Sequence, residues 1–252
     1  MASPSPDPVV LIHGAWQGSW GWAHLIPLLE AAGLEPHAVD LPGSGTETVP
    51  ASEITLETCL DYLDEVLTAI GRPVSLVGHS GGGVVASAAG ERFRDRVSRI
   101  AYVAGMMLPS GMTFGELQTS LEGRAGFSRG ISDRIVYSDD GLSSTVPPEA
   151  AAAIFFNDVP EDVALAAAQK LTPQAEGARA ILSELTPARF GTLPRLYVEA
   201  TDDRSVVMLA QRRMQELVPG ALVRTLTTGH APQLSNPEAL AEALVPFLKG
   251  EA

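Results

Sequence analysis

Short apolar runs alternate along the chain with longer amphipathic segments. The runs 9–12 and 74–77 are mainly apolar and rich in β-branched residues, whereas the segment 55–70 carries leucines at helical spacing. Continuous apolar strands are typical of a parallel sheet that is buried on both faces, and the intervening helices are typical of right-handed crossovers. The pattern therefore predicts an α/β fold with a mostly parallel sheet flanked by helices.

The same pattern gives the elements in order. Strands are expected at residues 9–12, 35–39, 74–77, 99–104, 195–200 and 221–226. Helices are expected at 20–32, 55–70, from the turn after Ser80 to about 94, 206–217 and 237–248. Gly33 and Gly71 follow two of these helices, where a C-cap glycine is favoured. The sheet should thus have at least six strands.

The alternation stops between residues 108 and 192. No convincing buried strand is found there, and helical segments are expected at 148–157, 160–170 and 173–185. Residues 1–107 and 193–252 are predicted to form the core, and 108–192 a helical cap inserted at the carboxyl edge of the sheet. Core and cap together are expected to form a single structural domain.

Composition narrows the class of protein. The chain has 252 residues, of which 45% are hydrophobic, and a net charge of −13, which opposes binding to nucleic acid or to an anionic membrane. Cys59, the single cysteine, is expected to be a buried thiol, so no intrachain disulfide can form. Residues 1–8 lack the features of a signal peptide and no apolar run could span a bilayer, so a cytoplasmic protein is expected. Oligomeric state is left open.

A glycine-framed serine follows the apolar run 74–77. Residues 78–82 read Gly-His-Ser-Gly-Gly, and a run of small residues suited to a packed helix comes next. A sharp turn from strand to helix would hold the Ser80 hydroxyl above the sheet, and Gly78 and Gly82 would let strand and helix approach behind it. Ser80 is the candidate nucleophile.

Reactive side chains also follow other expected strands. These are His13, the pair Asp202 and Asp203, and His230. Ligands bind beyond the carboxyl ends of the strands in an open α/β sheet. A nucleophilic serine needs a base, and the base needs an acid to orient it. His230 is the candidate base, and the acid is Asp203 or Asp202, since Glu199 falls within a strand.

Several motifs in this order resemble the α/β-hydrolase superfamily, most closely its group of small carboxylesterases, plant methyl-ester hydrolases and hydroxynitrile lyases. The likeness covers nearly the whole chain and rests on residues 10–16, 40–45, 76–82, 211–214 and 228–230. It implies an α/β-hydrolase fold with Ser80 as nucleophile and His230 as base. In the resembled group the acid lies a fixed short step before the glutamine that opens the Gln211 motif, so the resemblance favours Asp203 over Asp202 as acid. The backbone N–H groups of Ala15 and Gly81 would form the oxyanion hole.

The pocket above the serine is expected to be mostly apolar. It would suit small to medium hydrophobic esters, although any one apolar side chain of a cap is more often packing than pocket. The candidates to line it are His13, Trp16, His79, Met106, Met107, Met112, Phe114, Phe127, Phe155 and Phe156.

Three functions compete. Ester hydrolysis through an acyl-enzyme is favoured. The resembled hydroxynitrile lyases carry a lysine beside the catalytic histidine and a threonine after the first-loop histidine, where this chain has Ala231 and Gly14. A non-catalytic small-molecule receptor is less favoured, because the three candidate catalytic residues are all present. Neither metal-ligand spacing nor a phosphate-binding loop is found, so neither a metal nor a cofactor is expected.

Overall fold

Six parallel strands form the central sheet of the computed structural model, which describes residues 7–44, 49–179 and 181–251. Their order is β2-β1-β3-β4-β8-β9. The strands are β1 Asp7–Ile12, β2 Leu34–Val39, β3 Val74–His79, β4 Val97–Val103, β8 Arg195–Ala200 and β9 Ala221–Leu226. All six were predicted from the alternation of strands and helices along the chain. Residues 1–6 of the expected leader and Gly45 of one motif lie outside the described residues.

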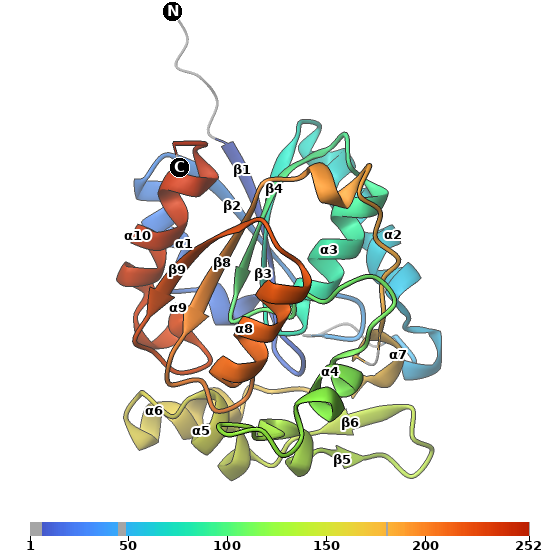
Figure 1. The fold of residues 1–252 in the computed structure, drawn as a ribbon, viewed down its shortest axis with the longest axis vertical. Helices are drawn as coiled ribbons and strands as arrows, with labels where there is room; N and C mark the ends of the chain where they lie inside the picture. Colours follow the sequence, from blue (N-terminus) through green and yellow to red (C-terminus); the bar gives the residue numbers. More distant parts are fainter. Residues whose placement is uncertain (1–6, 45–48, 180, 252) are drawn as a thin grey trace, which may run out of the picture.

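Helices cover both faces of this sheet (Figure 1). Residues of α1 and α10 pack with Val9, Leu11 and Val77 on one face. Residues of α2, α3 and α8 pack with Val10 and Leu76 on the other. Side chains that alternate along β1 thus enter two different cores, which explains why its apolar run is uninterrupted. The helices are α1 Ile26–Ala31, α2 Leu56–Ile70, α3 Gly82–Arg92, α8 Met208–Leu217, α9 Pro232–Ser235 and α10 Pro237–Leu248.

The predicted helix 20–32 is interrupted. A short 3₁₀ helix, η1 Ser19–Trp22, is followed by a turn, and α1 begins only at Ile26. Pro27 explains this start, since proline lacks an N–H and suits the first turn of a helix. By contrast, α2 begins as predicted, because Thr55 and Thr58 form a capping box. Gly71 ends it at a positive φ of 72°.

The segment between β4 and β8 is less helical than predicted. It contains α4 Phe114–Leu121, η3 Gly130–Arg134, β5 Val136–Tyr137, β6 Ser143–Thr145, α5 Pro148–Phe155, α6 Glu161–Ala168, β7 Gln174–Ala175, α7 Glu176–Arg179 and η4 Phe190–Thr192. The short strands pair antiparallel in the order β5-β6-β7. The expected helix 173–185 is wrong, because residues 174–175 pair with β6 and, of the described residues in this range, only 176–179 are helical.

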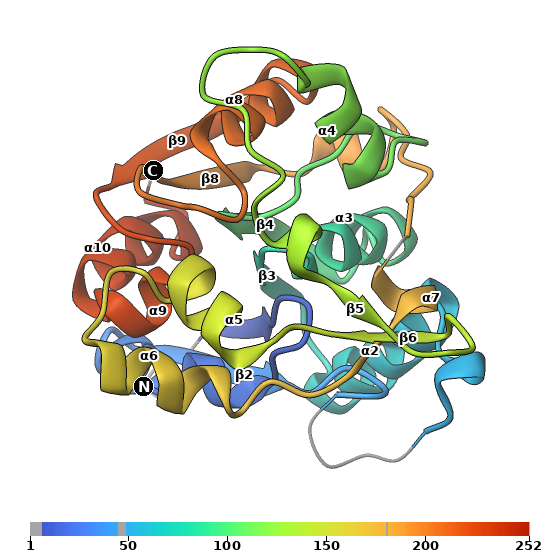
Figure 2. The same cartoon turned by 90° about the horizontal axis from the view of Figure 1, so that it is seen from below.

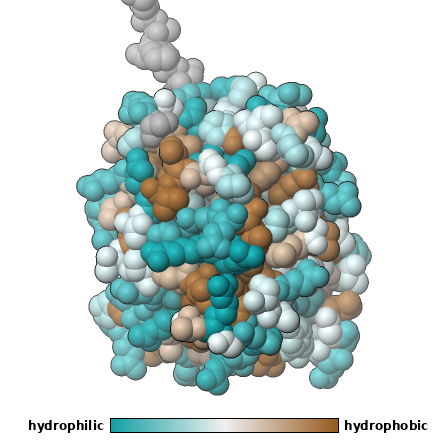
Figure 3. Space-filling model, viewed as in Figure 1, coloured by the Kyte–Doolittle hydropathy of each residue, from teal (hydrophilic) through white to brown (hydrophobic). Residues whose placement is uncertain are grey.

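The inserted elements α4, α5, α6 and the small sheet lie at the carboxyl ends of the strands, whereas η4 lies next to the start of β8 (Figure 1). Seen from that end, α4, α5, α6 and the small sheet spread across the mouth of the fold (Figure 2). One face of the molecule mixes hydrophilic and hydrophobic residues and carries a hydrophilic band across its middle (Figure 3). Within the described part of the chain, helices long and apolar enough to cross a membrane are absent. Cys59 is buried, as predicted.

Candidate active site

Ser80 lies in the turn between β3 and α3 with a positive φ of 50°. A side-chain-bearing residue rarely adopts this conformation, and here the surrounding chain imposes it. The backbone N–H of Ser80 donates to Val103 O, and its carbonyl accepts from Gly83 and Met106. A Cβ at Gly78 would lie 2.8 Å from Gly82 O. The strand and helix therefore approach as closely as the sequence predicts, and the Ser80 side chain is directed into a cavity.

Asp203 and His230 form a buried pair after β8 and β9. His230 Nδ1 donates to Asp203 Oδ2 over 2.8 Å. The other oxygen of Asp203 accepts the backbone N–H groups of Ser205 and Val206 at 2.7 and 2.9 Å. Because Nδ1 carries the proton, Nε2 of His230 keeps its lone pair. That atom is buried and has no hydrogen bond partner within the described residues, so it is available to accept a proton.

The competing acids have other surroundings. The Asp202 side chain is exposed, and the contacts of its backbone with Thr228 and Asn157 hold the loop. Glu199 is buried in β8 and accepts hydrogen bonds from Gln215 and Thr225. Of the three candidates, Asp203 is the one that contacts His230.

The backbone N–H groups of Ala15 and Gly81 belong to neighbouring loops, and Gly81 directly follows Ser80. A Cβ built on Gly81 would lie 3.7 Å from Ala15 N, so the two loops are in contact. The hydrogen bonds of the described residues use neither of these N–H groups, whereas the next one, Trp16 N–H, donates to Gln174 Oε1 at 3.1 Å. Gly14 permits this approach, since a Cβ there would lie 2.9 Å from Ser80 Cβ. The arrangement leaves two donors for a negatively charged oxygen.

His13 and His79 are buried histidines with fixed tautomers. His13 Nε2 accepts from Leu41 N–H at 3.1 Å, so Nδ1 carries the proton and donates to Gly14 O at 2.8 Å. His79 Nε2 donates to the carbonyl of His230 at 2.8 Å. Burial lowers the pKa of His13, against the effect of its bond to Gly14. Burial, and then the nearby His230, lower the pKa of His79 well below its ordinary value. Both side chains support loops of the site as neutral imidazoles.

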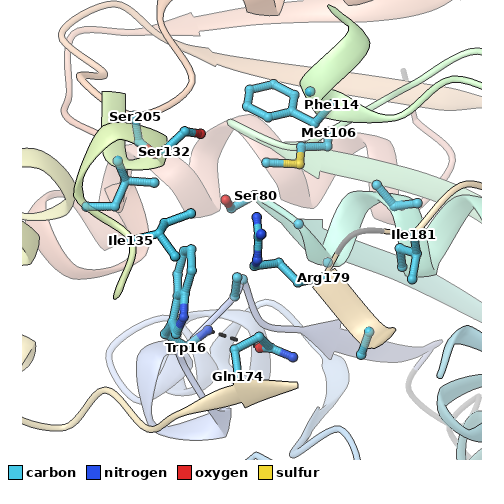
Figure 4. Close-up of a pocket in the computed structure, with 18 of the residues that line it drawn as sticks. Trp16, Ser80, Met106, Phe114, Ser132, Ile135, Gln174, Arg179, Ile181 and Ser205 are labelled. Carbon is cyan, nitrogen blue, oxygen red and sulfur yellow. Dashed lines mark hydrogen bonds between the residues drawn. The ribbon is translucent and has the colours of Figure 1, made fainter. Parts of the chain in front are cut away.

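A cavity of about 350 Å³ lies above Ser80. Five of the ten predicted pocket residues line it: His13, Trp16, Met106, Phe114 and Phe155. Figure 4 shows Trp16, Met106 and Phe114 around Ser80.

The other five predicted pocket residues do not line the cavity: His79, Met107, Met112, Phe127 and Phe156. Met107 is fully buried in the core cluster on one face of the sheet, and Phe156 is buried among cap residues. Met112 and Phe127 are half-buried and pack against the core cluster. The side chain of His79 is fully buried beneath the loop of His230. For the four apolar residues the prediction was wrong because apolar character alone does not separate pocket from packing, and for His79 because its ring turns to the His230 loop instead.

Polar cap residues in the lining were not predicted. Gln118, Arg129, Ser132, Tyr137, Gln174 and Arg179 all line the cavity. Their segments lack periodicity, so the sequence does not indicate which side chains face inward. Arg129 and Arg179 are two of many charged residues in the insertion, and the sequence does not distinguish them from the others. Clusters of three or more histidine, cysteine or acidic side chains suited to a metal are not found among the described residues.

Comparisons with known proteins agree with this geometry. The model of the alpha/beta hydrolase family matches residues 9–243. The chain is 30% identical over 252 residues to a pyrethroid hydrolase of Sphingobium wenxiniae, covering 97% of this chain and 88% of the relative. It is also 30% identical over 243 residues to methyl jasmonate esterase 1 of Vitis vinifera, covering 90% of this chain and 91% of the relative.

Solved structures give the same result. The crystal structure of a pyrethroid hydrolase from Sphingobium faniae superimposes with a TM-score of 0.84 at 27% identity, covering 98% of this chain and 99% of that one. The match includes the sheet, its flanking helices and the inserted segment, since nearly the whole of both chains is aligned. The chain therefore belongs to the alpha/beta hydrolase family.

Proposed function

We propose that the protein is a serine hydrolase that hydrolyses carboxylic esters of small molecules. The observation that carries this proposal is the buried Asp203–His230 pair with its free Nε2. The His230 ring stacks on Phe155, which lines the same cavity as the strained Ser80. The two related proteins named above are a hydrolase and an esterase, which supports the same reaction class.

The reaction begins with the serine. Ser80 Oγ attacks the ester carbonyl carbon while His230 Nε2 takes the hydroxyl proton. Asp203 holds the imidazole in the required tautomer and stabilises the imidazolium that forms. The negative charge on the carbonyl oxygen is met by the N–H groups of Ala15 and Gly81, each worth about 3 kcal/mol of transition-state stabilisation.

The tetrahedral intermediate formed by this attack then collapses to an acyl-enzyme, which water hydrolyses in a second stage. The bond to the leaving oxygen breaks, and His230 gives its proton to the departing alcohol. Water next attacks the acyl-enzyme on Ser80, losing a proton to His230, and the second collapse releases the acid and restores the serine. Ester and water are thus converted into acid and alcohol, with every proton carried by His230.

Apo geometry is compatible with this sequence of steps. Within the described residues, Ser80 Oγ and His230 Nε2 do not form a hydrogen bond. Such bonds are often long in the absence of substrate and shorten in the reacting complex. Phe155 stacks on the His230 ring at a centroid distance of 5.3 Å, which limits access of water to the base.

Lyase chemistry is disfavoured by Gly14 and Ala231. Gly14 is closely surrounded by Ser80 and His79, so a larger residue would collide with both. Ala231 is buried and apolar, and it offers no group to manage a cyanide ion.

The expected cytoplasmic localisation is a separate prediction, to be tested by cell fractionation.

Replacement of the nucleophile tests the reaction. Ser80→Ala is expected to lower kcat for short p-nitrophenyl esters by roughly 10³- to 10⁶-fold, because the covalent step is lost. Ser120→Ala, which changes an exposed serine of α4, is the matched control. Circular dichroism checks that both variants fold. Undiminished turnover by Ser80→Ala would sink the proposal.

A further inference from the structure

The charged side chains that line the cavity above Ser80 are all positive. Two arginines, Arg129 and Arg179, are in its lining, and aspartate and glutamate are missing from the described residues that line it. The chain as a whole has a net charge of −13, so this distribution is opposite to that of the molecule. The cavity therefore favours a ligand with a negative group or strong hydrogen-bond acceptors.

Arg179 is held in one orientation from behind. Its Nε and Nη2 donate to the two oxygens of Glu176 at 2.7 and 2.5 Å. Nη2 also donates to Tyr137 OH at 3.2 Å. The guanidinium lies 5.8 and 5.9 Å from the ring centres of Trp16 and Tyr137. A side chain fixed in this way loses little further entropy when it binds a ligand.

One nitrogen of this guanidinium remains unused. Nη1 of Arg179 makes none of the hydrogen bonds recorded for the described residues. Figure 4 shows the guanidinium extending from α7 into the cavity on the side where Ser80 lies. The side chain is 22% exposed, and Glu176 does not line the cavity. The two N–H bonds of Nη1 are thus available to a ligand in the cavity, whereas the carboxylate of Glu176, which pairs with Arg179, lies outside the cavity lining.

Arg129 is less suited to the same task. Its side chain is 37% exposed, and its ion pair with Glu122 lies at the surface. Charge interactions at such positions are screened by water and contribute little. The more buried Arg179, which lies close to two aromatic rings and is held by Glu176, is the stronger anion-binding group of the two.

We propose that the substrates are esters that carry a second, anionic group, such as monoalkyl esters of dicarboxylic acids, and that Arg179 binds the free carboxylate. This inference rests on the proposed ester hydrolysis at Ser80 and names its substrate class. The ester carbonyl is placed at Ser80 between the N–H groups of Ala15 and Gly81. The carboxylate is placed at Nη1 of Arg179, at a separate point of the same cavity.

The test uses two esters of nearly equal shape. Monomethyl glutarate carries a carboxylate, and methyl 5-oxohexanoate replaces its charged oxygen with a methyl group. The wild-type protein is expected to have the higher kcat/KM for monomethyl glutarate. In Arg179→Met the ratio of the two kcat/KM values should fall roughly ten- to a hundredfold, as expected for loss of a charge-assisted hydrogen bond. The change should lie mainly in KM, because the bond is remote from the reacting atoms.

Glu176 supplies a second variant with the opposite expectation. Glu176→Gln removes the competing negative charge but keeps an oxygen that can accept from Arg179, so the preference for monomethyl glutarate should rise a few-fold. Arg213→Met and Glu216→Gln are the matched controls, because these residues form an exposed ion pair of the same i,i+3 spacing on α8. Neither control should change the ratio.

Each outcome has a defined meaning. Equal turnover of both esters by the wild type, or an unchanged ratio in Arg179→Met, overturns the inference. An equal loss of both esters in Arg179→Met also overturns it, since Arg179 would then only support the Trp16 loop. In each of these cases the proposed function still holds, provided that ester hydrolysis is lost in Ser80→Ala. Hydrolysis of neither ester, with p-nitrophenyl esters also untouched, contradicts both.

Discussion

Neighbouring aspartates after β8 have opposite surroundings. Asp203 is buried and accepts from His230 and two backbone N–H groups, whereas the side chain of Asp202 is exposed. Asp203→Asn is therefore expected to lower kcat for ester hydrolysis by roughly 10³- to 10⁴-fold, because an amide favours the wrong tautomer of the base. Asp202→Asn changes no contact of His230 and should cost less than about threefold. Steady-state kinetics of both variants decide between them; a larger loss in Asp202→Asn would assign the acid to the other residue.

The sequence predicted which residues at the strand ends form the site. Ser80, Asp203 and His230 each follow an apolar run, and parallel strands bring their carboxyl ends to one edge of the sheet. The partners of these side chains were not predictable. The bond from His79 to the carbonyl of His230 joins residues 151 positions apart, and nothing in local spacing indicates it.

At the scale of elements, the local sequence pattern predicted the secondary structure correctly where residues are buried at regular intervals. It failed in the insertion, where burial is irregular. The inner strands β1 and β3 of the central sheet are largely apolar and buried because helices cover both faces. In the insertion, residues 174–175 form a strand because they pair with β6 and because Gln174 receives Trp16 N–H. Tertiary contacts thus override the expected helix at Gln174 and Ala175, whereas the residues from Glu176 to Arg179 are helical. The composition of the segment carries no trace of these contacts.

The turn between α5 and α6 joins the cap to the loop of the catalytic base. Asp158 Oδ2 accepts the backbone N–H of Gly229 at 2.5 Å, and Asn157 donates to Asp202 O at 3.2 Å. A Cβ at Gly229 would lie 2.6 Å from Asp158 Oδ1, so this glycine permits the contact. The cap therefore helps to place His230, the next residue in the chain.

Asp158→Ala tests this contact. Loss of the hydrogen bond is expected to lower the free energy of unfolding by about 1–3 kcal/mol, because Gly229 N–H is left without its partner. A shift of the base should also lower kcat, by up to roughly 100-fold. Urea unfolding and ester kinetics measure the two effects. Asp158→Asn keeps an acceptor oxygen and should recover much of both; an equal loss in this variant would show that the hydrogen bond is not responsible.

In the whole molecule, the site lies where the sheet meets the inserted segment. The lining combines residues from the loops after β1, β3 and β4 with residues of α4, η3, β7 and α7. The sheet side could be predicted because fold class determines it. The cap side could not, since it depends on irregular segments that only the folded chain brings together. The arginines that distinguish this cavity belong to that second set.

Two neutral histidines buried at this junction make global stability depend on pH. Burial lowers the pKa of His13 and of His79 below the ordinary value of 6.5, so the unfolded chain binds protons at a pH where the folded protein does not. The free energy of unfolding must therefore decrease as pH falls below about 6.5, by up to about 1.4 kcal/mol per pH unit for each histidine. Carboxylates such as Glu91, whose pKa is lowered from 4.5, add to this loss only in more acidic solution.

Urea unfolding between about pH 7.5 and pH 5.5 measures how steeply the free energy of unfolding depends on pH. His79→Gln should reduce this dependence by as much as one histidine contributes, with His24→Gln, at an exposed position, as the matched control. A free energy of unfolding that is constant over this range would contradict the assignment of both histidines as neutral supports of the site.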